Sequence, residues 1–407
     1  MTRRPRPPAR ACRTMRGRRA RYGFHDVALI LALASVAFLA CETGEPAQPL
    51  LRLEGPAATP VGPSIAPSRA LSPACEAACV RAVREGDDSD AWSTCYACKC
   101  VMELGPLPQP SELTCAKGEL VPIYRVASHD GIRVKERVVG EEPTECANPA
   151  MLDSVPVAQA CTPGVRLGQL ATKTAIFKWV CRQREGLAAD VSDLYDDMGV
   201  IGHNPSTGAT CFWVDHGGVD DRSDGVFPAL DVSDGNPEKL SALRRVLGGY
   251  EGDRCVVCHD NDPFVLSPHV SALWRWDLNA YLKGPYAQVR VAADPTDIPH
   301  RHLVSQKAEP CTRCHRLSDG RSCKTWVANA TGSLPRERPF QPELLDGGPE
   351  LYPFVFWMPP TLPSTHGEWD VEYGKAVEHI RECCNAPDTV GCAWEPVPGF
   401  RTHVSSP

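Results

Sequence analysis

Twenty cysteines in 407 residues constrain this chain more than any other feature of its sequence. Four of them stand in two strings of the same form, Cys255-Val-Val-Cys258-His259 and Cys311-Thr-Arg-Cys314-His315. Each string places two thiols three residues apart and an imidazole directly after the second thiol. Cysteine pairs at this spacing form zinc sites, reducible dithiol centres or attachment points for a covalent cofactor.

The pattern C-x-x-C-H is the attachment signature of c-type haem: two thioethers hold the porphyrin, and the histidine binds the iron. The two strings, 56 residues apart, resemble c-type cytochromes over about residues 250–385 and nowhere else. This resemblance implies two haems c. Their covalent anchors would be Cys255, Cys258, Cys311 and Cys314, and their proximal iron ligands His259 and His315. A Cys₄ zinc site and a dithiol redox centre are the alternatives, and the signs of export described next favour haem.

The first 40 residues have the composition of a signal peptide. Nine arginines up to residue 21 precede the apolar run Val27–Ala40, which is short for a bilayer span. The run ends in Phe38-Leu39-Ala40-Cys41, which resembles a bacterial lipobox except that Phe38 replaces the usual aliphatic residue. The resemblance implies a lipid anchor on Cys41 and a place in the periplasm or cell envelope, with the outer membrane favoured. A plainly cleaved signal or an uncleaved anchor would fit the same residues.

Residues 41–73 are rich in proline and alanine and predict a tether without a core of its own. The whole chain has a net charge of −7, and the first 40 residues contribute +8 from nine arginines and Asp26. The remainder therefore carries −15. Such a charge argues against nucleic acid as a partner. It suits a basic redox partner protein, and it equally suits a soluble exported surface without such a partner.

Fourteen cysteines remain once Cys12, Cys41 and the four motif cysteines are set aside, so up to seven disulfides are expected in an oxidising compartment. The densest group predicts a helical hairpin. Residues 74–84 and 91–100 read as helices, and Gly86-Asp87-Asp88 separates them. Disulfides Cys79–Cys95 and Cys75–Cys98 would join the two helices.

Two other interpretations of the same group compete. Cys95-Tyr96-Ala97-Cys98-Lys99 reads C-x-x-C-K, a form that some multihaem nitrite reductases use to attach a haem with a lysine ligand. The five cysteines of this group also have the composition of an iron–sulfur ligand set. Both interpretations require free thiols where the hairpin requires disulfides.

The rest of residues 74–245 predicts an α+β, disulfide-rich domain of unknown role. We expect a β-hairpin over Leu120–Val139, a helix over Leu170–Arg184, a strand over Thr207–Val214 and a helix over Lys239–Leu247. One group of residues reads either as a polar loop, which we favour, or as a metal site: His203, Asp215, His216, Asp220, Asp221 and Asp224.

Residues 246–395 predict a mainly α, loop-rich domain that is similar to cytochrome c and holds two haems. The run Phe356-Trp357-Met358-Pro359-Pro360 resembles the loop that supplies the distal methionine of small cytochromes, so Met358 is the expected distal ligand of the second haem. For the first haem we expect His302, and after it His300, whereas His269 is too close to the proximal ligand. A helix over Trp369–Cys383 with Val371, Ala376, Val377 and Ile380 on one side would follow, and Cys383, Cys384 and Cys392 would close the end, with Cys323 as one partner.

These features predict an exported, membrane-anchored dihaem cytochrome that carries electrons. A haem enzyme such as a dihaem peroxidase is the alternative, with one iron left open to a small ligand. The motifs of dihaem peroxidases lie much further apart than 56 residues, one in each of two complete domains. A cytochrome fused to a binding or sensing module is a third possibility, with the module in residues 75–240.

Overall fold

The structure is a computed structural model of the chain. It describes residues 71–85, 89–129, 132–137, 164–182, 195, 197–216, 225–247, 259–265, 270, 273, 284–291, 301–320, 323 and 370–398. All of these belong to one compact unit, residues 68–407. Several predictions fall outside the described residues: the signal peptide, the lipid site Cys41, most of the tether, and the residues Cys255, Cys258, His269, His300 and Met358.

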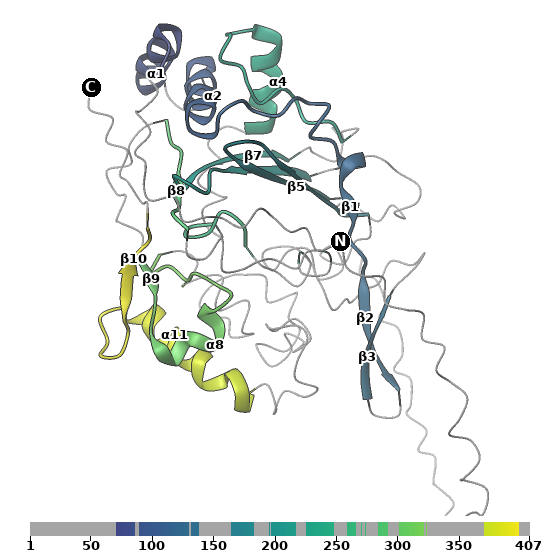
Figure 1. Ribbon diagram of the computed structural model, residues 1–407, viewed down its shortest axis with the longest axis vertical. Helices are drawn as coiled ribbons and strands as arrows, with labels where there is room; N and C mark the ends of the chain where they lie inside the picture. Colours follow the sequence, from purple (N-terminus) through teal and green to yellow (C-terminus); the bar gives the residue numbers. More distant parts are fainter. Residues whose placement is uncertain are drawn as a thin grey trace, which may run out of the picture. The chain divides into compact units, whose positions relative to one another are not determined.

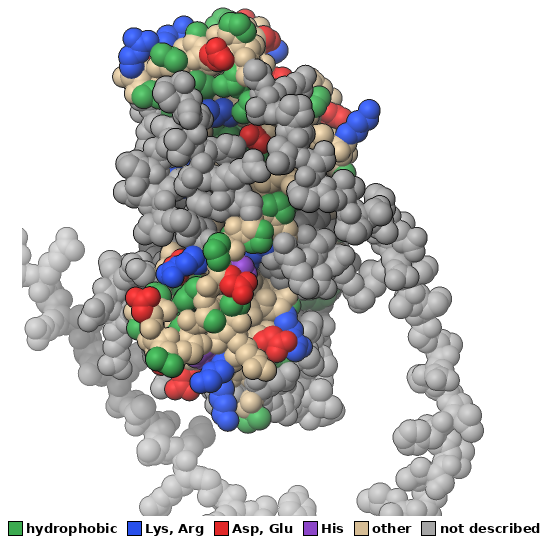
Figure 2. All heavy atoms as spheres, turned by 60° about the vertical axis from the view of Figure 1, so that its left-hand side comes forward, with side chains coloured by type: hydrophobic (Ala, Val, Ile, Leu, Met, Phe, Trp, Pro, Cys, Tyr) green, Lys and Arg blue, Asp and Glu red, His purple; other side chains and the backbone are tan. Residues whose placement is uncertain are grey.

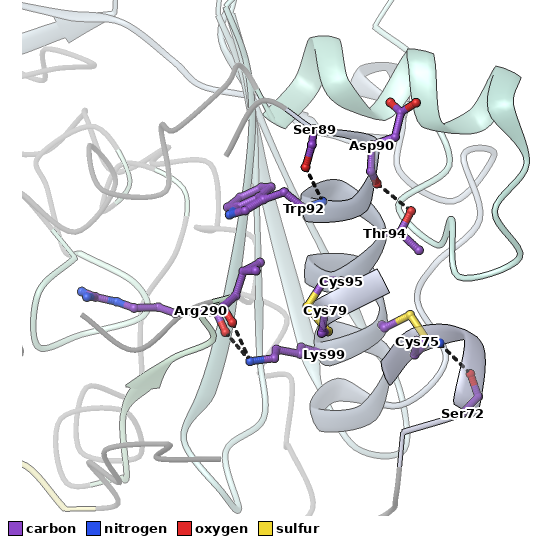
Figure 3. Close-up of a disulfide and its surroundings, with 12 residues drawn as sticks. Ser72, Cys75, Cys79, Ser89, Asp90, Trp92, Thr94, Cys95, Lys99 and Arg290 are labelled. Carbon is purple, nitrogen blue, oxygen red and sulfur yellow. Dashed lines mark hydrogen bonds between the residues drawn. A yellow bond between two sulfur atoms is a disulfide. The ribbon is translucent and has the colours of Figure 1, made fainter. Parts of the chain in front are cut away.

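Two cross-linked helices begin the described chain. Helix α1 covers Pro73–Glu85 and helix α2 covers Asp90–Leu104. Disulfides join Cys75 to Cys98 and Cys79 to Cys95, which confirms the predicted pairing (Figure 3). The hydroxyl of Ser89 accepts a hydrogen bond from the backbone N–H of Trp92 at 3.1 Å and so caps α2.

A six-stranded sheet follows, in the order β1-β4-β5-β6-β7-β8 (Figure 1). Its strands are β1 Glu119–Leu120, β4 Arg166–Ala171, β5 Ile176–Arg182, β6 Asp197–His203, β7 Ala209–His216 and β8 Ala287–Gln288. Every pair is antiparallel except β7 with β8, which is parallel. The predicted strand over Thr207–Val214 is therefore present as β7, preceded by a turn.

The helix predicted over Leu170–Arg184 is wrong, because this segment contains the end of β4, a turn and β5. Its apolar residues satisfy a helical spacing, but Phe177, Trp179 and Cys181 also alternate, and all three are buried on one face of the sheet. Pairing with strands on both sides decides the conformation, and the disulfide Cys115–Cys181 fixes β5 further. The hydroxyl of Thr172 accepts a bond from the N–H of Ala175 at 3.0 Å and closes the turn.

The largest core lies between the helices and the sheet. Phe177, Trp179 and Trp213 of the sheet bury their side chains with Tyr96 and Leu104 of α2. Disulfide Cys100–Cys211 joins α2 to β7 directly. Helix α4, Pro237–Leu247, contacts both α2 and β7 and confirms the predicted helix, which begins two residues earlier than expected.

The predicted β-hairpin is present as a separate two-stranded sheet, β2 Tyr124–His129 with β3 Ile132–Arg137. Its register pairs His129 with Ile132, so two residues connect the strands, the length that the predicted turn requires.

A second core brings together the elements near the carboxy terminus. They are β9 Arg301–Leu303, the short helices η2 Gln306–Ala308 and α8 Glu309–Thr312, helix α11 Lys375–Asn385 and β10 Trp394–Pro396. The π-helical turn η7 Asp370–Gly374 directly precedes α11. Disulfides Cys323–Cys384 and Cys383–Cys392 pair the cysteines expected to close this end.

The last predicted helix is present, but one residue of its apolar face is wrong. Ala376, Val377 and Ile380 are buried, whereas Val371 is 85% exposed. Val371 lies in the π-helical turn, whose wider spacing rotates the Val371 side chain away from the face that α11 buries.

Strand β8 connects residues on both sides of the boundary predicted near residue 245. Gly208, just before β7, permits the close approach of the chain that leads into β8, because a Cβ at position 208 would lie 2.5 Å from the carbonyl carbon of Pro285. Its φ of +83° also favours glycine. The sheet built by residues before 245 therefore extends into the range that carries the two C-x-x-C-H motifs.

The described surface carries charges of both signs: Figure 2 shows Lys and Arg side chains interspersed with Asp and Glu on one face. Among the described residues, the longest helix, α2, has 15 residues, and none of the helices is long and apolar enough to cross a membrane.

We expect disulfide Cys100–Cys211 to stabilise the fold more than Cys79–Cys95, because it closes 111 residues rather than 16. Chain entropy predicts a loss of about 4.7 kcal/mol for Cys100→Ala with Cys211→Ala, against about 3 kcal/mol for Cys79→Ala with Cys95→Ala. Urea unfolding under non-reducing conditions measures both. Equal losses, or a larger loss for the shorter loop, would contradict the assigned connectivity.

Candidate haem site

The second C-x-x-C-H motif forms a helical turn that continues from α8. The N–H groups of Cys314 and His315 both donate to the carbonyl of Cys311, at 3.1 Å each. Residues three and four apart on a helix share one face, so both sulfurs and the imidazole leave the same side of this turn. This is the placement needed for two thioethers and a proximal histidine on one porphyrin.

Cys311 and Cys314 are the two described cysteines that form no disulfide, although twelve others do. Burial and then the neighbouring Cys314 raise the pKa of the Cys311 thiol to about 11. Burial also raises the pKa of Cys314. A dithiol redox centre needs the opposite shift, because the thiolate is its reactive form. The environment therefore disfavours the dithiol interpretation of this motif.

Both motif histidines are neutral at physiological pH. Burial lowers the pKa of His259 to about 4 and that of His315 to about 4. A neutral imidazole is the form that binds iron, so neither ligand would have to lose a proton first.

The sheet forms a wall beside the first motif. Its helix-facing side buries Phe177 and Trp213, and the opposite side presents the cross-strand row of Lys178, Ile201 and Phe212. The ring of Phe212 lies 5.7 Å from the ring of His259, centroid to centroid. The hydroxyl of Tyr286, one residue before β8, donates a short hydrogen bond to the carbonyl of His259.

The next residues of the first motif segment also lie against this wall. The Nζ of Lys178 is 4.5 Å from the centre of the Phe264 ring. The ring of His203 contacts Phe264 edge-on at 5.9 Å, and its Nδ1 lies 2.9 Å from the hydroxyl of Thr210. Burial lowers the pKa of His203 to about 3 and that of Lys178 to about 6.

A buried polar network joins the segments that follow the two motifs. The hydroxyl of Ser318 donates a short hydrogen bond to the carboxylate of Asp260. The backbone N–H of Arg316 donates to the carboxylate of Asp262 at 3.1 Å, and the two side chains form an ion pair at 3.6 Å. Arg316 and Ser318, which follow His315, thus bind Asp262 and Asp260, which follow His259. These contacts hold the two histidines in neighbouring segments.

Arg316 is the centre of this network. Its guanidinium, 1% exposed, also donates to the carbonyls of Asn261 at 3.2 Å and Gly284 at 2.9 Å. Burial raises the pKa of Asp262, and the Arg316 charge opposes that shift. Removing one member of such a pair leaves a buried charge without its counter-ion, which is why the network is costly to interrupt.

Of the predicted distal ligands, only His302 is described. It lies in β9, where its backbone pairs with Glu395 of β10 and bridges to Ser318. Burial and then the charge of Arg316 lower its pKa. His302 is therefore beside the segment that follows the second motif, and its assignment to the first haem stays a prediction.

Two other predicted clusters have different roles. His203 and His216 lie at opposite ends of the β6–β7 ladder, because His203 pairs with Thr210 and His216 with Asp197. These two histidines therefore do not converge on one metal, and both lie on strands, so the favoured polar loop is wrong for them. The sulfurs of Cys95 and Cys98 are in disulfides, so a third haem is not attached there in this state, and Lys99 donates to the carbonyls of Arg290 and Val291 at 2.9 Å each (Figure 3).

A further cluster brings His379, Cys383 and Cys392 within metal-binding distance of one another. Cys383 and Cys392 are joined as a disulfide, and Nε2 of His379 lies 2.6 Å from the hydroxyl of Ser305. That hydroxyl donates to the carbonyl of Gly391 at 3.0 Å. The cluster joins α11 to the loops on either side and offers no thiolate ligand.

Sequence reasoning missed Lys178, Phe212 and Arg316 as parts of the site. The signal available for Arg316 was its position next to His315. Nothing in the sequence pairs it with Asp262, 54 residues earlier.

A scan of protein-family models finds no family that matches this chain, and searches of curated proteins and of solved structures find no match either.

We expect Lys178→Met to remove a pH dependence of folding stability. Burial lowers the pKa of Lys178 from 10.5 to about 6, so the folded state binds a proton at Lys178 less readily than the unfolded state does. Stability contributed by the neutral amine is present above pH 10.5 and falls as the pH is lowered toward 6, by at most about 1.4 kcal/mol per pH unit. Urea unfolding at pH 9, 8 and 7 should show that the free energy of unfolding of the variant increases relative to that of the wild type with each decrease in pH. A difference in unfolding free energy that stays constant with pH would contradict the lowered pKa of Lys178.

We expect Arg316→Met to destabilise the folded protein by about 3–5 kcal/mol, because Asp262 stays buried without its partner. The double variant Arg316→Met with Asp262→Leu should lose less than the single variant. Urea unfolding measures the difference.

Arg313→Met is the matched control, from the same motif. Arg313 pairs with Glu309 at 3.0 Å, but both side chains are more than half exposed, so its loss should stay within about 0.5 kcal/mol. Equal losses at positions 313 and 316 would show that the buried network does not hold the two segments together.

Proposed function

We propose that this protein is an exported dihaem c-type cytochrome that carries electrons. The observation that carries the proposal is the pair Cys311 and Cys314, two free thiols beside a half-buried, neutral His315 among described cysteines that are otherwise all in disulfides. Covalent haem attachment is the use of a C-x-x-C-H turn that requires two free thiols at this spacing.

The residues of the site fit a pair of haems. Cys255, Cys258 and His259 would hold the first haem, with His302 as its proposed distal ligand. Cys311, Cys314 and His315 would hold the second haem, with Met358 as its proposed distal ligand. When bound, each haem supplies one-electron redox chemistry, and the chain tunes it through axial ligands, burial and nearby charge. The network of Asp260, Asp262, Arg316 and Ser318 would hold the two proximal histidines at a constant separation.

The buried charge of Arg316 would act on both irons. A fixed positive charge stabilises the reduced, less positive state of each iron, and Asp262 partly offsets that effect. The wall formed by β5, β6 and β7 would exclude water from the first site. We further propose a cytochrome-like domain in residues 246–395 and a lipid anchor at Cys41 that places the protein at the outer membrane, facing redox partner proteins.

We expect the protein made in a host that matures c-type cytochromes to carry two covalent haems. Intact-mass analysis of the denatured protein, together with haem staining on a denaturing gel, counts them. The variant Cys311→Ala with Cys314→Ala should carry one haem, and adding Cys255→Ala with Cys258→Ala should leave none.

Cys95→Ala with Cys98→Ala is the control, because these cysteines also stand three residues apart but are in disulfides. It should keep both haems. A colourless wild type, or zinc bound at the four motif sulfurs, would overturn the proposed function. Rapid cyanide binding with peroxide turnover would replace the carrier by a dihaem peroxidase.

A further inference from the structure

A series of contacts runs from His259 to the disulfide-linked helical hairpin: two are between aromatic rings, and the step between them is a hydrogen-bonded link from a tyrosine hydroxyl to the backbone of Phe212. The ring of Phe212 is 5.7 Å from that of His259. The backbone of Phe212 is bonded to the hydroxyl of Tyr96, and the ring of Tyr96 stacks on Trp92 at 5.3 Å with an interplanar angle of 8°. Trp92 is partly exposed.

We propose that this series is the route by which electrons from a reduced one-electron carrier protein reach the first haem, with the partly exposed Trp92 at its surface end. The inference rests on the proposed function and gives the hairpin, whose role the sequence leaves open, a part in it. One electron leaves the reduced partner and passes to the ferric iron, which becomes ferrous. No bond forms or breaks, and Trp92, Tyr96 and Phe212 are neither oxidised nor reduced, since they only provide a tunnelling path through two ring contacts and one hydrogen-bonded step.

Tyr96 carries the route across the sheet. Its hydroxyl accepts a hydrogen bond from the N–H of Phe212 at 2.7 Å and donates to the carbonyl of the same residue at 3.1 Å. Tyr96 lies on the helix-facing side, whereas the Phe212 side chain leaves on the other side, toward His259. The two hydrogen bonds thus bridge the one layer of backbone that separates the hairpin from the motif.

Disulfides hold both ends of this bridge. Cys95, bonded to Cys79, directly precedes Tyr96, and Cys211, bonded to Cys100, directly precedes Phe212. Figure 3 shows Trp92 on α2, one turn before the Cys79–Cys95 disulfide. These cross-links restrict the motion of Tyr96 and Phe212. The rate of electron tunnelling depends on the distance between them.

The experiment places a ruthenium photosensitiser on the holoprotein through an introduced histidine, Asp90→His, and follows reduction of the haem by transient absorption. In this background Trp92→Leu and Tyr96→Phe should each slow the intramolecular electron transfer by an order of magnitude or more. Tyr96→Phe keeps the ring and removes only the hydroxyl that reaches Phe212, so it stays informative if Trp92→Leu fails to fold.

A second label position is the control. With the photosensitiser at Val390→His, a fully exposed site in the carboxy-terminal part, the same two substitutions should leave the rate unchanged. Haem spectra and midpoint potentials should also stay unchanged, which a disturbed haem site would not allow. Equal rates from Asp90→His with and without the substitutions would overturn the route alone. A colourless protein would overturn the proposed function, and the route with it.

Discussion

Covalent cross-linking is the constraint on which the described structure depends. Six disulfides join its elements, and two of them connect positions 66 and 111 residues apart. They attach the helical hairpin to the sheet and α11 to the loops around it. Short strands and long irregular segments bury less apolar surface than continuous elements, so restricting the unfolded chain contributes a larger share of the stability. Among the described cysteines, those of Cys311-Thr-Arg-Cys314-His315 keep free thiols, so their sulfurs can form other bonds.

The sheet serves both halves of the described chain. One face buries the aromatic core shared with α2, and the other presents Lys178 and Phe212 to the segment that follows the first motif. Strand β8, contributed by residues between the motifs, completes the sheet. The cysteine-rich part is therefore more than an appended module, because it builds one wall of the candidate haem site. The buried pair of Arg316 with Asp262 joins the two motif segments in the same region.

Several local structures were predictable because short-range signals are sufficient for them. Cysteines at i and i+4 in a helix, followed by a break, predicted the pairing in α1 and α2, and His129-Asp130-Gly131 predicted the turn between β2 and β3. The segment 170–184 was not predictable in this way. Its apolar residues fit helix and strand alike, and pairing with β4 and β6 decided between them. Val371 was misplaced because a single π-helical turn rotated it away from the core.

The sequence by itself determined the chemistry available at each motif, since two thiols and an imidazole at fixed spacing are a property of five consecutive residues. It also determined the cross-links within the hairpin, where helix geometry brings the sulfurs together. Only the tertiary structure decided which distant groups surround the motifs. Asp262 and Arg316 are 54 residues apart, and Phe212 precedes His259 by 47, so the contacts between them arise from chain folding that no local pattern encodes. Burial then sets the charge of these groups, because an ionised side chain loses its solvation only when the rest of the fold encloses it.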